Sequence, residues 1–215
     1  MIALDAMGGD LGPRETVGGA LIAAAEGIDV TIVGDEATLR AELQRRHANP
    51  SNLHIKHAPD VVAMGDHAAR EVRRARETSM YVGTEMVKRG EADAFVTIGN
   101  TGAAMATSLV VLGRLRGVER PALSAVLPGN EGPVMLLDVG ANADARSSHL
   151  VTFAHLGAAY MHVVHGIEHP RVATLSIGEE PTKGSILVVE THETLAAEGV
   201  LNFVGNVESR DILTG

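Results

Sequence analysis

The sequence predicts an α/β protein with three layers, in which a mostly parallel β-sheet is covered by helices on both faces. Short aliphatic and β-branched runs alternate along the chain with longer segments that have helical periodicity. Only 2% of the 215 residues are aromatic, and glycine occurs 24 times. This composition suits helices and strands that pack closely around a core of small and aliphatic side chains.

Eight apolar runs predict the strands of this sheet. They are residues 1–6, 30–34, 53–57, 94–99, 122–127, 134–140, 171–178 and 201–205. Most of the connections between them are long enough for a helix, as parallel strands require.

Helical spacing is clearest in the segment that follows the first strand. Val17, Ala20, Leu21 and Ala24 fall on one face of a helix, which predicts that this face is buried. Asp35 follows the second strand and is predicted to cap the next helix. No repeat or obvious linker interrupts residues 1–215, so we expect a single domain, with at most a weak boundary near residues 115–121.

Composition and charge exclude several classes of protein. A formal net charge of -9 argues against nucleic-acid binding, and the absence of cysteine excludes disulfides, thiolate metal sites and a cysteine nucleophile. No apolar run reaches the ~20 residues that cross a bilayer. The first ten residues read as a strand and a turn rather than a signal peptide. We therefore expect a cytoplasmic protein.

Six predicted strands end in glycine together with Asp, Asn or charged residues. The segments are DAMGGD, VGD, IGNTG, DVGAN, IGEEPTKG and VGNVESRD. Any one of them can be a turn built for backbone reasons alone. Because parallel strands end at one edge of a sheet, six together predict a site at that edge, where exposed N–H groups and helix N-termini favour phosphate or carboxylate.

Familiar site motifs are missing from these turns. The first turn lacks the dinucleotide-binding fingerprint, and neither a P-loop nor a G-x-S-x-G elbow occurs in the chain. His162, His165 and His169 lie close in sequence, but no H-E-x-x-H pattern accompanies them. We therefore predict no metal site.

A series of segments in the same order resembles the bacterial phosphate acyltransferase family, PlsX. These segments are ALDAMGGD, RARETSM, IGNTGA, RPAL, LLDVGAN, IGEEPTKG and NFVGNVESRD. The resemblance covers essentially the whole chain. Family members continue well past residue 215, so it implies that the chain is truncated at its C-terminus.

The resemblance implies a reaction in phospholipid synthesis. Acyl-(acyl carrier protein) and inorganic phosphate give acyl phosphate, which a downstream membrane glycerol-3-phosphate acyltransferase consumes. The implied fold is like that of isocitrate and isopropylmalate dehydrogenases and of phosphotransacetylase, with no cofactor. The implied protein is a homodimer that works at the cytoplasmic surface of the membrane.

Candidate site residues come from the glycine-rich strand ends. The catalytic candidates are Lys183, Asn100, Asn142, Asn206, Arg210 and Asp5. The candidates for binding phosphate are Gly8, Gly9, Asp10, Thr101, Gly102 and Gly184. Lysine and arginine supply full positive charge, and the asparagines supply hydrogen bonds to phosphate or to an oxyanion. For the carboxylates of Asp5 and Asp10 three roles are open: to orient these cations, to take a proton from phosphate, or to cap a turn.

Carrier protein is acidic, so an acidic enzyme needs a local basic patch to bind it. Arg70, Arg73 and Arg74 share one face of a predicted helix and form our candidate docking site. A solvated face paired with Glu71 and Glu77 is the alternative.

Two other functions fit the same residues. The first is a phosphotransacetylase-like transfer from acyl-CoA to phosphate. The second is a non-catalytic scaffold that binds acyl carrier protein. A dehydrogenase function rests on fold analogy alone.

Overall fold

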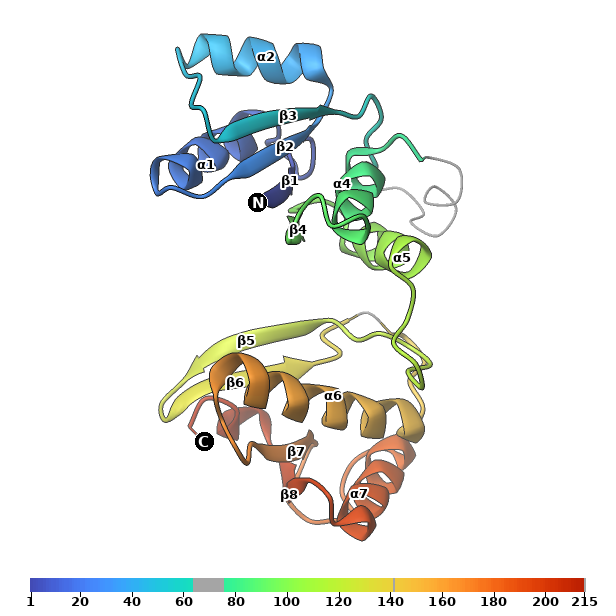
Figure 1. The fold of residues 1–215 in the computed structure, drawn as a ribbon. Coiled ribbons are helices and arrows are strands. Elements are labelled where there is room, and N and C mark those ends of the chain that lie inside the picture. Colours follow the sequence, from blue (N-terminus) through green and yellow to red (C-terminus); the bar gives the residue numbers. More distant parts are fainter. Residues whose placement is uncertain (64–75, 141, 215) are drawn as a thin grey trace. The chain divides into compact units, whose positions relative to one another are not determined.

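A computed structural model describes residues 1–63, 76–140 and 142–214 of the chain (Figure 1). The chain divides into two compact units, unit 1 (Met1–Gly113) and unit 2 (Arg114–Gly215). Their boundary falls beside the weak boundary predicted near residues 115–121. The assignment of residues 1–215 to a single domain stays a prediction.

Unit 1 is built around a parallel sheet with the strand order β3-β2-β1-β4. The strands are β1 (Ile2–Asp5), β2 (Val30–Gly34), β3 (Leu53–His57) and β4 (Ala94–Val96). The helices are α1 (Arg14–Ala25), α2 (Glu36–Arg45), α4 (Ser79–Lys88) and α5 (Thr101–Val111). Four of the predicted strands are thus confirmed as neighbours in one parallel sheet.

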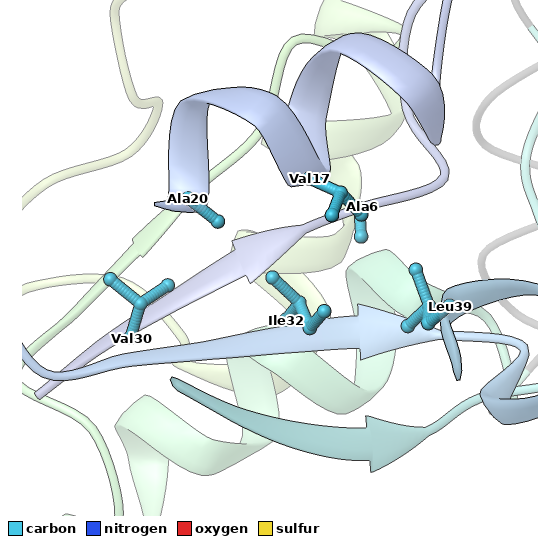
Figure 2. Close-up of a cluster of buried hydrophobic side chains, with 6 residues drawn as sticks. All are labelled: Ala6, Val17, Ala20, Val30, Ile32 and Leu39. Carbon is cyan, nitrogen blue, oxygen red and sulfur yellow. The ribbon is translucent and has the colours of Figure 1, made fainter. Parts of the chain in front are cut away.

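Strand β2 is the centre of this unit, because all five of its residues are buried. Its side chains alternate between the two faces of the sheet. Ile32 joins a cluster with residues of α1 and α2, and Val33 joins another with residues of α4. The first cluster consists of Ala6, Val17, Ala20, Val30, Ile32 and Leu39 (Figure 2). Helices therefore cover both faces, and the three-layer prediction is confirmed for unit 1.

Both local predictions for the helices of unit 1 are confirmed. Val17, Ala20 and Ala24 are buried on the inner face of α1, and Leu21 packs partly buried against the same cluster. The Asp35 carboxylate caps α2, where it accepts hydrogen bonds from the Thr38 hydroxyl at 2.6 Å and the Thr38 N–H at 2.9 Å. These two bonds lower the pKa of Asp35.

The described residues of unit 2 form four strands and two long helices. The strands are β5 (Ser124–Gly129), β6 (Gly132–Leu137), β7 (Arg171–Leu175) and β8 (Asn202–Val207). The helices are α6 (Ser147–His165), α7 (Ile186–Glu198) and the short 3₁₀ helix η1 (Ser209–Asp211). Strands β7 and β8 are parallel, whereas β5 and β6 form an antiparallel hairpin.

The prediction that six strands end at one shared edge is wrong for the sheets of the described residues. These strands form three sheets, and β6 belongs to the hairpin. The hairpin arises because Asn130 and Glu131 alone connect Gly129 to Gly132, and two residues are too few for a parallel crossover. The strand ends therefore form separate groups, one after β1, β2 and β4 and another after β7 and β8.

None of the described helices combines the length and the apolar character that a membrane-spanning helix needs.

The acid dependence of stability should be reduced when Glu42 is replaced. Hydrogen bonds from Arg45 and Arg46 lower the pKa of Glu42 from 4.5 to about 2 in the folded chain. The folded pKa lies below the unfolded one, so these bonds stabilise the fold fully above about pH 4.5 and lose their effect as the pH falls through about 2. Glu42→Gln should therefore lower the midpoint of thermal unfolding much more at pH 7 than at pH 2. A difference that is the same at both pH values would contradict this account, and Glu26→Gln at the end of α1 serves as the control.

Candidate functional site

The ends of β1 and β4 lie side by side in unit 1. The two strands are parallel, with Leu4 opposite Val96. The turn after β1 and the turn that leads from β4 into α5 are therefore neighbours at the carboxyl edge of the sheet. Residues 8–10 belong to the first turn, and residues 100–102 lie where the second turn enters α5; all six are predicted for the site.

Asp5 links the two turns through three hydrogen bonds. Its side chain is 1% exposed. One carboxylate oxygen accepts from the N–H groups of Met7 at 3.2 Å and Gly8 at 3.0 Å. The other accepts from the Thr97 hydroxyl at 2.8 Å, and that hydroxyl in turn accepts from the N–H of Gly99 at 3.0 Å. Asp5 therefore holds the backbone of both turns in place.

Close packing around this carboxylate requires two of the glycines. A Cβ atom at Gly8 would lie 2.6 Å from an Asp5 oxygen and 3.0 Å from the Gly99 nitrogen. A Cβ atom at Gly99 would lie 2.7 Å from the terminal carbon of Met80. Gly9 has a φ of 79°, a conformation that side chains with a Cβ rarely adopt. The glycines are thus needed to bring the two turns together.

Helix α5 begins at this point. The Asn100 side chain accepts from the N–H of Ala103 at 3.0 Å and so caps the helix. Thr101 and Gly102, the first two helical residues, are exposed, as is Asp10 in the neighbouring turn. Because the first N–H groups of a helix have no partner within it, the exposed start of α5 suits an anion.

A second group of predicted residues lies at the carboxyl edge of β7 and β8 in unit 2. Asn206 is 6% exposed. Its amide donates to the carbonyl oxygen of Glu180 at 2.9 Å, and its oxygen lies 3.0 Å from Nδ1 of His192. The side chain therefore ties the end of β8 to the loop after β7 and to α7.

Lys183, Gly184 and Arg210 lie in exposed segments at this edge. The Ser176 hydroxyl donates to the carbonyl oxygen of Lys183 at 3.0 Å and shapes the loop there. Arg210 is near three carboxylates, those of Glu179 at 3.3 Å, Glu208 at 3.5 Å and Asp211 at 3.7 Å. These pairs are long and at least partly exposed to solvent, so they hold the guanidinium only weakly.

Asn142 is engaged within its own turn. Its amide donates to the carbonyl oxygen of Pro121 at 3.0 Å and to the carboxylate of Asp138 at 2.9 Å. Asp138 has a φ of 62°, the left-handed conformation that Asp tolerates better than most residues. Since an amide has two N–H donors, Asn142 has none left for an oxyanion in this arrangement.

The predicted site residues therefore fall into groups. Asp5, Gly8, Gly9, Asp10, Asn100, Thr101 and Gly102 lie together in unit 1, and Lys183, Gly184, Asn206 and Arg210 lie together in unit 2. Asn142 lies apart from the second group, at the end of β6. Arg70, Arg73 and Arg74 lie outside the described residues. The catalytic and binding roles of all these residues stay predictions.

Sequence reasoning missed several residues that shape these groups. Thr97 was read only as part of a strand, although a hydroxyl at a strand end is a recognisable signal for a hydrogen bond across the edge. His192 lies in the middle of a helix, and nothing in the sequence indicates its contact with Asn206. Among the described residues no three His, Asp or Glu side chains gather as metal ligands would. The absence of a metal stays a prediction.

Comparison with known families and sequences gives a consistent result. The model of a family described as fatty acid synthesis protein matches residues 1–215. A phosphate acyltransferase from Pelotomaculum thermopropionicum is 47% identical over the whole chain, and one from Thermus thermophilus is 52% identical over 214 residues. The chain spans 62% and 64% of the lengths of these relatives.

A solved structure shows the same fold. A phosphotransacetylase from Streptococcus pyogenes matches with a TM-score of 0.69 and 18% sequence identity. The match covers 97% of this chain and 68% of that one. The predicted phosphotransacetylase-like α/β fold is thus confirmed.

Replacing Asp5 should destabilise unit 1 strongly. Asp5→Ala leaves the buried N–H of Gly8, the part-buried N–H of Met7 and the Thr97 hydroxyl without their acceptor, which should cost about 3 kcal/mol of unfolding free energy. Asp5→Asn keeps the size of the side chain and one acceptor oxygen, so it should cost less than half as much. Urea unfolding measures both variants, and equal losses would contradict the proposed role of the carboxylate.

Two glycine replacements should have opposite effects. Gly8→Ala places a Cβ atom 2.6 Å from the Asp5 carboxylate and should lower the unfolding free energy by about 1–3 kcal/mol. Gly19→Ala places its Cβ atom in open space on α1 and should raise the unfolding free energy by about 0.5–1 kcal/mol. The same urea titration tests both, and a stabilising Gly8→Ala would show that the turn is not tightly packed.

Proposed function

Because this chain belongs to the fatty acid synthesis protein family, we propose that it transfers an acyl group from acyl-(acyl carrier protein) to inorganic phosphate. The products are acyl phosphate and free carrier protein. Two relatives that are 47% and 52% identical to the chain are phosphate acyltransferases, which supports the reaction class. Acyl phosphate made in this way serves phospholipid synthesis.

The observation that carries this proposal is the exposed start of α5 beside the glycine turn of β1. Thr101 and Gly102 present the first N–H groups of an eleven-residue helix, where the helix dipole adds partial positive charge. Gly8 and Gly9 lie close to Gly99 and Ile98, just before this helix, and have no side chains that would cover the site. This arrangement favours a small anion with several oxygens, such as phosphate.

The chemistry needs no nucleophile from the protein, because phosphate is the nucleophile. A phosphate oxygen attacks the carbonyl carbon of the thioester, and a tetrahedral oxyanion forms. The C–S bond then breaks, and the sulfur leaves as a thiolate that takes up a proton. The protein contributes by desolvating and orienting the phosphate and by donating hydrogen bonds to the oxyanion. The absence of cysteine is compatible with this scheme.

Lys183 and Arg210 are proposed to supply full positive charge to phosphate. Both side chains are in exposed segments at the end of the β7–β8 sheet. The three carboxylates around Arg210 lie 3.3–3.7 Å away in solvent, so a phosphate dianion can compete with them for the guanidinium.

The partners follow from the same reaction. An acyl donor and phosphate belong to any phosphate acyltransferase. Acyl carrier protein as the donor, a homodimeric state, delivery to a membrane glycerol-3-phosphate acyltransferase and contact with the cytoplasmic membrane surface are parts of the proposal. Acyl-CoA is the second candidate donor, because the chain shares its fold with a phosphotransacetylase.

The proposal is tested by following thioester loss from palmitoyl-carrier protein with the 215-residue chain. We expect loss only when inorganic phosphate is present, with hydroxylamine trapping an acyl phosphate. Palmitoyl-CoA in place of the carrier protein distinguishes the two donors. Thioester loss that does not depend on phosphate, or no loss at all, would overturn the proposal for these residues.

Lys183→Ala and Arg210→Ala should each raise the KM for phosphate by about tenfold or more, since each removes a charge-assisted hydrogen bond. Arg40→Ala is the matched control. Its guanidinium pairs with Glu36 at 2.7 Å on the surface of α2, and neither residue belongs to a candidate group. Unchanged phosphate kinetics in both Lys183→Ala and Arg210→Ala would exclude these residues from the phosphate site.

A further inference from the structure

A series of hydrogen bonds leads from α7 to the backbone of Lys183 in unit 2. The amide of Asn206 donates to the carbonyl oxygen of Glu180 at 2.9 Å. The N–H of Lys183 donates to the same carbonyl oxygen, also at 2.9 Å. The side-chain oxygen of Asn206 lies 3.0 Å from Nδ1 of His192. Lys183 is therefore connected to a histidine of α7 through Asn206 and one shared carbonyl oxygen.

The direction of each bond in this series follows from the groups that can only accept. A carbonyl oxygen has no hydrogen, so the Asn206 amide must turn its NH2 group toward Glu180. The amide oxygen then faces His192 and accepts, which places a proton on Nδ1 of the imidazole. Asn206 is 6% exposed, so its polar atoms need partners within the protein. A flipped amide would lose both bonds, and His192 therefore helps to fix the orientation of Asn206.

The backbone of Lys183 is held on both sides. Its N–H closes a β-turn on Glu180, in which Pro181 occupies the second position, where its fixed φ is favourable. Its carbonyl oxygen accepts from the Ser176 hydroxyl at 3.0 Å. Gly184 follows with a φ of 111°, and a Cβ atom there would lie 2.8 Å from the oxygen of that hydroxyl. The loop after β7 thus has a defined backbone path at Lys183.

The first carbons of the Lys183 side chain are placed by the same loop. A Cβ atom at Gly178 would lie 3.0 Å from Cγ of Lys183 and 3.4 Å from its Cβ, so the side chain starts against this glycine. Lys183 itself is exposed. The direction in which its side chain leaves the fold is therefore set by the path of the loop.

His192 is held in place independently of this loop. It lies in α7, the helix that follows the loop. Its ring packs edge-on against Phe203 of β8, with 5.1 Å between the ring centroids and 75° between the ring planes. Packing of this kind needs an aromatic ring but no N–H group. The hydrogen bond to Asn206 needs the N–H, so the two roles of the imidazole can be separated by mutation.

We propose that His192 is a positioning residue for the phosphate site, which acts through Asn206 and the Glu180 carbonyl to aim Lys183 at phosphate. This inference rests on the proposed function, in which the Lys183 ammonium binds phosphate. A loop that is already ordered loses less freedom when it binds a ligand, so positioning of this kind raises the affinity for phosphate. His192 has this effect without touching the substrate.

The test compares two replacements of His192 in the 215-residue chain. His192→Phe keeps a ring against Phe203 but removes the N–H donor, whereas His192→Asn offers an N–H near the position of Nδ1 without the ring. The dissociation constant of inorganic phosphate is measured by NMR titration. We expect His192→Phe to weaken phosphate binding about tenfold, because a misplaced cation loses its contact with the anion. His192→Asn should restore most of this loss.

Two further variants separate positioning from a general loss of structure. His155→Phe makes the same replacement in α6, where the imidazole lies 2.9 Å from the carboxylate of Glu198, and should leave phosphate binding unchanged. In a Lys183→Ala background, His192→Phe should weaken phosphate binding little further, because the cation that it positions is gone. A general loss of structure would instead weaken binding by the same factor in both backgrounds.

The outcomes distinguish this inference from the proposed function. The inference alone is overturned if Lys183→Ala weakens phosphate binding but His192→Phe leaves it unchanged or acts equally in both backgrounds. It is also overturned if His192→Asn binds phosphate as weakly as His192→Phe, since the ring and not the N–H would then matter. If the wild-type chain binds no phosphate, or Lys183→Ala binds it as tightly as the wild type, the proposed phosphate site fails and the inference fails with it.

Discussion

The buried carboxylate of Asp5 is the interaction on which the candidate site depends. It accepts two N–H groups from the turn after β1 and a hydroxyl from the end of β4, and so fixes two loops that are more than ninety residues apart in sequence. Gly99 of the IGNTG segment packs close to this carboxylate, and a Cβ atom there would lie 2.7 Å from the terminal carbon of Met80. Gly102 lies exposed at the start of α5. The polar and small residues of these two turns are thus explained by the packing of the turns alone, whether or not they also bind a ligand.

The asparagines at the strand ends have internal roles in both units. Asn100 caps α5, Asn142 bonds to Pro121 and Asp138, and Asn206 bonds to the loop after β7. Each holds a turn in place through its side chain. In the phosphate site proposed for unit 1, backbone N–H groups therefore remain as the main donors, and their direction is fixed before a ligand arrives.

Local features of the fold were predictable from sequence, and long-range pairing was not. Residues 30–34 and 53–57 were predicted as strands with the observed bounds, and the Asp35 cap was recognised. The hairpin of β5 and β6 was missed, although Gly129 and Gly132 around a two-residue turn are a local signal for one. The contact of Thr97 with Asp5 joins residues that are 92 positions apart, and no sequence pattern specifies which strand ends become neighbours.

The two units differ in how completely the backbone groups of their strands are paired. In unit 1, the strands β1 and β2 each pair on both sides, and the core is formed by strand and helix residues together. In unit 2 the buried apolar residues are Phe153, Met161 and Leu195, all on helices. Unpaired strand edges attract any extended chain, so an uncovered β6 or β7 favours aggregation unless a specific strand pairs with it.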